Sequence, residues 1–407
     1  MANGWCRTCP APRDRRTPDL TPLDIAVAGC GTAGLAAALL LHRDGHRVTL
    51  FERFETPQPL GSGLLIQPTG RAVLRTLGLE TALLERGARV DRLIGEANGR
   101  TVLDVRYAAL KGDRFGVGVH RATLFDILHD AVRGDGIAVE TGRAVIGRDG
   151  QRLRFATGAS GRFDLIVDAM GSHSALAPAC GNPLAYGALW ADLEWAGDFD
   201  PHALQQRYRR ASVMAGVLPI GTPRHATASR AALFWSLRAD RLNDWRVAEL
   251  DAWKGEVATL WPATTPLLDQ IADAAQLTFA RYAHRTLRTP VEPGLIHIGD
   301  AWHSTSPQLG QGANMALLDA YALALGLRRA RMLPDALAEA VRLRRDQIML
   351  YQALSRMLTP VYQSDGAALP WLRDRVMGPL SKLWPATTLQ AALVSGAIGS
   401  PLGRLGL

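Results

Sequence analysis

The residues best placed to do chemistry begin with a glycine-rich turn at residues 29–34, Gly-Cys-Gly-Thr-Ala-Gly. At this spacing Gly29 permits a tight bend, Gly31 lets the backbone approach a pyrophosphate, and Gly34 lets a helix pack closely on a strand. Glu52 follows about eighteen residues later, where a carboxylate accepts hydrogen bonds from the hydroxyls of an adenosine ribose. Together the two features predict a dinucleotide-binding unit.

A second motif occupies residues 299–303, Gly-Asp-Ala-Trp-His, and continues over residues 307–314, Pro-Gln-Leu-Gly-Gln-Gly-Ala-Asn. Asp300 comes at the end of a predicted buried strand, where a carboxylate can hold the hydroxyl of a polyol. Gly310 and Gly312 precede a predicted helix and free several backbone N–H groups to point at a ligand. Such a nest stabilises negative charge on a bound ring system.

The elements around these motifs follow from hydrophobic periodicity and from glycine and proline positions. Residues 23–29, 35–43 and 47–52 predict a strand, a helix and a second strand, which make one βαβ unit of about thirty residues. Further predictions are helices over 68–79, 122–132, 313–327 and 336–357, short strands over 137–167, an antiparallel sheet over a pocket within 183–283, and a buried strand over 295–299.

With both motifs in place, the chain resembles the single-component FAD-dependent aromatic hydroxylases, the family of p-hydroxybenzoate hydroxylase and salicylate hydroxylase. The resemblance covers about residues 23–345 and implies that FAD is the cofactor. Its ADP half would lie on the first motif and its flavin on the second. The FAD-binding residues that the resemblance implies are Gly29, Gly31, Ala33, Gly34, Glu52, Arg53, Arg121, Asp300, Pro307, Gly310, Gln311, Gly312, Ala313 and Asn314.

The resemblance also implies an activity. NADH or NADPH reduces the FAD, O2 adds to form a flavin C4a-hydroperoxide, and one oxygen atom passes to an electron-rich, aromatic small molecule. The alternatives are a dehydrogenase or reductase of the same fold and a flavin-binding protein without turnover. No catalytic base can be picked from the sequence. Several side chains within the predicted sheet are candidates for the substrate pocket: Trp190, Tyr208, Met214, Phe234, Trp235, Tyr282 and His284.

One stretch departs from the family pattern. Where the family carries Gly-Ala-Asp-Gly-x-x-Ser, residues 168–174 read Asp-Ala-Met-Gly-Ser-His-Ser. Met170 takes the place of the aspartate, and Asp168 takes the place of a glycine. Because the family aspartate is linked to FAD and to NAD(P)H, two readings of Asp168 stay open: it substitutes for the missing carboxylate, or it caps the turn that follows the strand.

Composition narrows the remaining possibilities. The chain has 407 residues, 47% of them hydrophobic, and a net charge of +8. The positive charge is scattered and no nucleic-acid recognition motif is present, so a nucleic-acid partner is not expected. No run of apolar residues is long enough for an integral membrane segment, and no metal site is predicted. The few cysteines favour a reducing cytoplasm: Cys6, Cys9, Cys30 and Cys180.

The expected fold class is α/β for the FAD-binding part, and α+β when the antiparallel-sheet domain is included. It combines a Rossmann-like FAD-binding domain, an antiparallel-sheet substrate domain and a C-terminal helical segment. The expected divisions are a flexible tail at 1–22, an FAD-binding domain at 23–182 and 284–345, a substrate-binding sheet domain at 183–283 and a helical extension at 346–407. The apolar stretch 386–407 is expected to bury itself against the body or against a second subunit of a homodimer rather than on a membrane surface.

Overall fold

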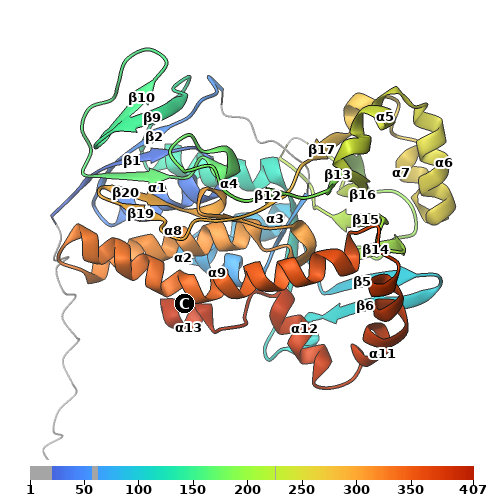
Figure 1. The fold of residues 1–407 in the computed structure, drawn as a ribbon. Coiled ribbons are helices and arrows are strands. Elements are labelled where there is room, and N and C mark those ends of the chain that lie inside the picture. The colour runs from blue at the N-terminus through green and yellow to red at the C-terminus, as the bar shows by residue number, and fades with distance from the viewer. Residues whose placement is uncertain (1–20, 57–62, 225) are drawn as a thin grey trace, which may run out of the picture.

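The computed structural model describes residues 21–56, 63–224 and 226–407. The predicted flexible tail and its cysteine pair therefore lie outside the described residues, apart from positions 21 and 22. Figure 1 shows a lobe built around a mostly parallel sheet and a second lobe built around a larger, mostly antiparallel sheet, with C-terminal helices running beneath both. The predicted fold class is confirmed.

The first lobe contains the βαβ unit. Its six-stranded sheet is parallel from β20 to β8, with β19 antiparallel at one edge. Four of these strands, β1, β2, β11 and β20, correspond to the predicted buried strands. In spatial order the strands are β19 (Val291–Glu292), β20 (Leu295–His297), β11 (Leu165–Asp168), β1 (Asp24–Ala28), β2 (Arg47–Phe51) and β8 (Ala138–Glu140).

Helices cover one face of this sheet and a hairpin covers the other. Helix α1 carries Leu and Ala on all its sides, so it is buried along most of its length between the sheet and α8. Phe51 on the opposite face packs against Phe155 of the hairpin. The hairpin strands, and the helices of this lobe that cover the sheet or pack on those that do, are α1 (Thr32–Arg43), α2 (Pro68–Thr76), α3 (Glu80–Arg86), α4 (Arg121–Gly134), α8 (Gly312–Arg329), α9 (Leu333–Tyr362), β9 (Val145–Asp149) and β10 (Arg152–Phe155).

The second lobe is a seven-stranded sheet. Its core strands are antiparallel as predicted, but it also takes two strands from residues 92–106 that the sequence did not identify as strands, and β5 pairs in parallel with β14. In spatial order the strands are β17 (Thr278–Ala280), β13 (Tyr186–Glu194), β16 (Arg230–Arg238), β15 (Val213–Pro219), β14 (Ala203–Arg209), β5 (Arg92–Ala97) and β6 (Arg100–Arg106).

This sheet has two different faces. The outer face packs against three short helices that were not predicted, α5 (Leu242–Val247), α6 (Leu250–Leu260) and α7 (Thr265–Leu268). The inner face is turned toward the first lobe, to which two small sheets join it. These sheets consist of β3 (Gly63–Ile66), β7 (Gly116–His120) and β4 (Ala88–Val90), and of β12 (Asn182–Pro183), β18 (Ala283–Thr286) and β21 (His303–Ser304).

The C-terminal segment folds back onto both lobes. Its helices are α10 (Ala368–Leu372), α11 (Gly378–Leu380), α12 (Ala386–Val394) and α13 (Pro401–Leu405). Helices α11 and α12 lie against β6, and α13 lies against α9. Gln311 donates its side-chain N–H to the carbonyl of Val394 at 2.6 Å, and Tyr351 donates its hydroxyl to the carbonyl of Leu393 at 2.8 Å. The predicted burial of residues 386–407 against the body is confirmed for Ala391, Val394 and Leu405. Among the described residues no helix is both long and apolar enough to cross a bilayer.

Candidate active site

The glycine turn lies between β1 and α1, and each glycine meets a different constraint. Gly29 has φ of 102°, and a Cβ there would lie 2.7 Å from the carbonyl oxygen of Ala169. A Cβ at Gly34 would lie 1.9 Å from the carbonyl oxygen of Gly29, so helix and turn can approach this closely only because Gly34 lacks a side chain. At Gly31 no heavy atom lies within 4 Å of the Cβ position. Open space beside a helix N-terminus suits a pyrophosphate.

Glu52 stands beside this turn, directly after β2. Its carboxylate accepts the N–H of Cys30 at 2.9 Å and the N–H of Phe54 at 3.2 Å. Those bonds fix the carboxylate against the turn, and carboxylate oxygens retain further lone pairs for ribose hydroxyls. Arg53 is exposed, and its guanidinium lies 4.5 Å from the ring centroid of Phe54.

The second motif is held in place by a buried acid on α8. Asp319 accepts the N–H of Gly299 at 3.0 Å, and it pairs with His303 and Arg344 at 2.7 Å each. Burial by itself would raise the pKa of Asp319, but the positive partners outweigh it and leave the pKa below its usual value. His303 therefore acts through Asp319 to hold the loop that carries Asp300.

Asp300 lies in the short 3-10 turn that follows β20. Its side chain is accessible to solvent, yet protein surrounds it so closely that desolvation raises the pKa of the carboxyl group. The charges of His303 and Arg121 partly offset that rise. A carboxylate that is accessible but poorly solvated gains from a ligand hydroxyl that donates to it, which fits a ribityl chain.

The loop after β21 ends in the N-terminus of α8. The backbone of Gly310 has a left-handed conformation, with φ of 59°. At Gly312 no heavy atom lies within 4 Å of the position that a Cβ would take. Asn314 fixes the loop: its amide accepts the backbone N–H of Gln67 at 2.8 Å and donates to the carbonyl of Gly310 at 2.9 Å. Pro307 begins the short 3-10 turn before Gly310.

Two buried amide groups beside this loop lack protein partners in the described part of the chain. They are the side-chain N–H group of Gln67 and the side-chain oxygen of Gln311. A buried donor or acceptor without a partner costs free energy unless a ligand or water satisfies it. Together with the open positions at Gly31 and Gly312, these groups fit a bound dinucleotide that continues into a flat heterocycle. Ala313 is half-buried in the first turn of α8.

Arg121 lies near both Asp300 and Tyr282. It begins α4 and is exposed, and within the described residues its guanidinium makes no hydrogen bond or ion pair. Its charge acts on both Asp300 and Tyr282 and lowers the pKa of each, although burial is the larger effect at both. Arg121 is thus placed near the second motif and near one predicted pocket residue.

The structure decides between the two readings of Asp168. Its carboxylate is fully buried and accepts the N–H of Met170 at 3.1 Å and the hydroxyl of Ser174 at 2.6 Å, and it bonds Nδ1 of His297 at 2.6 Å. Asp168 therefore caps the turn after its strand. Met170 is half-buried and lies beside the glycine turn, since its Cα would be 3.1 Å from a Cβ at Gly29. Asp168 therefore does not supply the carboxylate that is missing at position 170.

The predicted pocket residues divide between the two faces of the seven-stranded sheet. Trp190, Tyr208 and Met214 lie on the inner face, and Tyr282 joins them because the indole N–H of Trp190 donates to its hydroxyl at 3.0 Å. Trp235 does not belong with them. It lies on the outer face, edge-on to Trp253 of α6 at 6.4 Å between ring centroids.

Phe234, another residue proposed from the sequence, lies on the inner face, and two further residues there, Gln206 and Tyr362, were not predicted. Phe234 packs against Trp190, with ring centroids 4.7 Å apart. Gln206 is buried and accepts the hydroxyl of Tyr208 at 3.0 Å. Tyr362 of α9 packs 5.7 Å from Tyr208. Period-two alternation places Gln206 on the same face as Tyr208 and was a usable signal, whereas nothing local indicates that Tyr362 reaches this sheet.

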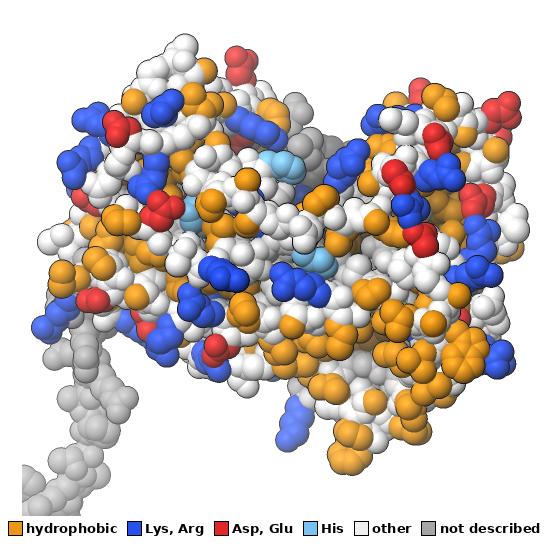
Figure 2. Space-filling view, viewed as in Figure 1, with side chains coloured by type: hydrophobic (Ala, Val, Ile, Leu, Met, Phe, Trp, Pro, Cys, Tyr) orange, Lys and Arg blue, Asp and Glu red, His pale blue; other side chains and the backbone are white. Residues whose placement is uncertain are grey.

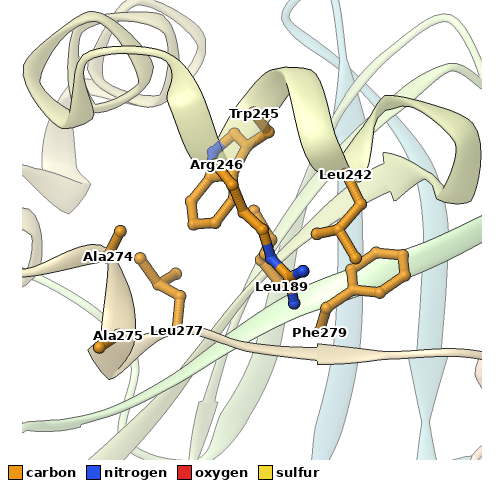
Figure 3. A pocket seen from close by; sticks show the side chains of 8 residues that line it. All are labelled: Leu189, Leu242, Trp245, Arg246, Ala274, Ala275, Leu277 and Phe279. Atoms are coloured by element: carbon orange, nitrogen blue, oxygen red, sulfur yellow. The ribbon is translucent and has the colours of Figure 1, made fainter.

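A separate cavity of about 200 Å³ lies on the outer face. Figure 3 shows it between the sheet and the short helices, with Arg246 extending across it. Leu189 and Phe279 form its floor. Because Leu189 precedes Trp190 on the same strand, the two side chains point to opposite faces. This cavity is not part of the candidate active site. No group of three or more His, Cys, Asp or Glu side chains within the described residues is arranged to hold a metal ion.

Comparisons with known proteins agree with this geometry. The family model described as "FAD binding domain" matches residues 22–332. The aurachin C monooxygenase/isomerase of Stigmatella aurantiaca is 28% identical over 381 residues, which cover 89% of this chain and 95% of the relative. The 6-methylpretetramide 4-monooxygenase of Streptomyces rimosus is 31% identical over 346 residues, which cover 79% of this chain and 80% of the relative.

Among solved structures, 2-methyl-3-hydroxypyridine-5-carboxylic acid oxygenase superimposes with a TM-score of 0.76 at 22% identity, over 94% of this chain and 98% of that one. This likeness confirms the fold. The family model, which matches most of the chain, identifies the cofactor as FAD. The curated relatives identify the reaction type as monooxygenation. The chain belongs to the FAD binding domain family and is an FAD-dependent monooxygenase.

Proposed function

We propose that this monooxygenase hydroxylates an oxygen-substituted aromatic ring, bound between the 307–314 loop and the inner face of the seven-stranded sheet. One observation carries the placement. Gln308 of the loop donates to the side chain of Gln363 at 3.2 Å, and Gln363 donates to the carbonyl of Gly187 on β13 at 3.4 Å. This bridge sets the loop beside the strand that bears Trp190.

We assign FAD to the two motifs as the sequence predicts. Gly31 leaves room for the pyrophosphate at the N-terminus of α1, Glu52 accepts from the ribose, and Asp300 accepts from the ribityl chain. The backbone of residues 310–314 borders the ring. FAD supplies the activation of oxygen, after reduction by NADH or NADPH. The chain positions the substrate and excludes water, since most of the inner face is apolar.

Two groups are placed to orient the substrate. Tyr282 keeps its phenolic proton because burial raises its pKa to about 12, so it can donate to a substrate oxygen. Arg121, which acts on the pKa of Tyr282, favours a substrate that carries a phenolate, carboxylate or enolate. The name of a relative from Streptomyces cremeus, 3-amino-4-hydroxybenzoate 2-monooxygenase, describes oxygenation of a hydroxybenzoate, which supports the same substrate class here.

We further propose a division of labour that follows the sheets. Residues 23–182 and 284–345 hold FAD, and 183–283 bind the substrate, together with the β5–β6 hairpin that joins their sheet. Residues 346–407 support the 307–314 loop through Gln363 and Val394. The few cysteines, of which Cys30 and Cys180 are free thiols, support a cytoplasmic enzyme. A homodimer stays a prediction.

The test uses the purified, FAD-loaded chain with NADH or NADPH under air. Oxygen-substituted benzoates, quinolones and polycyclic phenols are screened for faster nicotinamide oxidation and for a product heavier by one oxygen atom. We expect a compound from one of these classes to accelerate nicotinamide oxidation and to give the product that is heavier by one oxygen atom. Nicotinamide oxidation that yields only hydrogen peroxide with every compound would contradict the substrate class. No oxidation of either nucleotide would contradict the proposed electron donors.

A further inference from the structure

Exposed apolar side chains are concentrated in one part of the C-terminal segment. Nine of the fifteen large hydrophobic side chains that stand exposed on the described surface fall within residues 369–389. Figure 2 shows orange side chains gathering at the lower right, over α11 and α12. We name this surface the C-terminal apolar face; its members are Leu369, Trp371, Leu372, Val376, Met377, Leu380, Leu383, Trp384 and Leu389.

The C-terminal apolar face is a formed surface rather than a loose end. Behind it Arg373 is fully buried and donates to the carbonyls of Val361 at 3.2 Å and Arg210 at 3.0 Å. Its guanidinium also lies 4.8 Å from the ring centroid of Tyr208. A Cβ at Gly378 would lie 3.2 Å from the backbone carbonyl of Thr101 on β6. The face is therefore held firmly against the second lobe, while Trp384 is 83% exposed.

The unpaired side-chain charges of this segment are all positive. Between residues 366 and 407 the sequence holds a single acidic side chain, Asp374, and it pairs with Arg373 at 2.8 Å. Asp365 pairs with Arg238. Arg375 and Lys382 are exposed and have no carboxylate partner within the described residues. The apolar face thus carries two uncompensated cations and no uncompensated acid.

We propose that the C-terminal apolar face docks onto the surface of an anionic lipid bilayer. Exposed Leu and Trp side chains enter the boundary between headgroups and acyl chains, and neighbouring Lys and Arg side chains meet lipid phosphates. Docking of this kind needs no spanning helix. A second copy is the less suitable occupant, because a twofold interface would bring Arg375 and Lys382 of each copy toward like charges.

Co-sedimentation with vesicles tests the proposal on the full-length, FAD-loaded protein. Vesicles of phosphatidylcholine alone are compared with vesicles that contain phosphatidylglycerol, at low and high salt. We expect the protein to pellet with the anionic vesicles, to be released by salt, and to stay in solution with the neutral ones. Retention in the supernatant with both vesicle types would overturn the proposal.

Substitutions locate the contact. The triple variant Trp371→Gln, Leu383→Gln and Trp384→Gln is expected to weaken partitioning by about tenfold or more. The variant Arg375→Gln with Lys382→Gln is expected to weaken it by about 30-fold, because each cation near an anionic surface contributes about fivefold. The matched control changes three equally exposed apolar residues elsewhere and is expected to bind as the unchanged protein: Val247→Gln, Met332→Gln and Met349→Gln.

Two outcomes would refute this assignment. One is that the triple variant and the control lose binding to the same extent, which would show a nonspecific effect. The other is that light scattering finds a dimer that the triple variant converts to a monomer, which would show that a second copy covers the face. FAD content and circular dichroism check that every variant is folded.

Discussion

Trp190 donates its indole N–H to the phenolic oxygen of Tyr282 at 3.0 Å and so joins β13 to the segment that enters β18. Because Tyr282 accepts this bond, its own proton remains for another acceptor. Burial raises the pKa of Tyr282 to about 12, so the proton stays in place at physiological pH. A neutral donor held by an inner-face tryptophan is suited to orient an oxygen-substituted ring.

Replacing Tyr282 by Phe is expected to lower kcat/KM for the substrate by about 3- to 10-fold, the value of one hydrogen bond, while FAD content stays the same. Steady-state kinetics with absorbance of bound FAD measure both. Trp190→Phe is the companion variant. It removes the donor but keeps the phenol, so it should affect kcat/KM less. An unchanged kcat/KM in Tyr282→Phe would show that the phenol does not contact the substrate.

Gly31→Ala and Gly34→Ala should fail in different ways. Gly31 has φ of −76° and free space at its Cβ position, so alanine folds normally but places a methyl group where the pyrophosphate is proposed to lie. We expect an unchanged Tm for the apoprotein and at least about tenfold weaker FAD binding. Gly34→Ala clashes with Gly29 and should destabilise the fold itself. Gly161→Ala, at an open position in a surface turn, is the control.

Asp300→Asn tests the proposed ribityl contact. Since desolvation raises the pKa of Asp300, its ionised form opposes folding at neutral pH, and removal of the charge should leave the Tm of the apoprotein unchanged or higher. FAD affinity should fall by about tenfold, because a charged acceptor is lost. Fluorescence titration gives the Kd and calorimetry gives the Tm. A lower apoprotein Tm with unchanged FAD affinity would point to a purely structural role.

Asp319→Asn should destabilise the protein by about 3–5 kcal/mol at neutral pH, because Arg344 is left as a buried charge without its carboxylate. The pKa of Asp319 is lowered in the folded state. Its contribution is therefore fully present above the ordinary carboxyl pKa and is lost as the pH falls through the lower folded value. Unfolding free energies measured from pH 7 downward should differ by a constant amount until about pH 4 and then approach each other as the pH falls further. A gap that stays constant at still lower pH would contradict the ionic origin.

Met170→Asp introduces the carboxylate that the resemblance to the aromatic hydroxylases implies at this position. Since Asp168 is engaged in capping the turn, it cannot supply this group, and we expect the substitution to tighten FAD binding by about 3- to 10-fold through one added hydrogen bond. The same titration, together with the KM for NADH and NADPH, is the measurement. Met170→Leu, which keeps the position apolar, should behave as the unchanged protein.

The sequence predicted those parts of the fold that local patterns determine. The glycine turn, the helix after Gly312 and the buried parallel strands each have their own signal. The pairing of β5 with β14 joins residues more than a hundred positions apart, and no periodicity reports it. The error at Trp235 has a related cause: strands β13 and β16 are apolar on both faces, so alternation does not show which tryptophan faces inward.

The hydrogen bond from Gln311 to the carbonyl of Val394 also bears on biosynthesis. The loop proposed to border the flavin rests on a segment that lies some eighty residues further along the chain and is translated after it. A nascent chain that ends before residue 394 already holds both nucleotide motifs but lacks this support. Stable loading of the cofactor is therefore expected only after residue 394 has been synthesised, and changes to the segment around Val394 should reduce flavin retention.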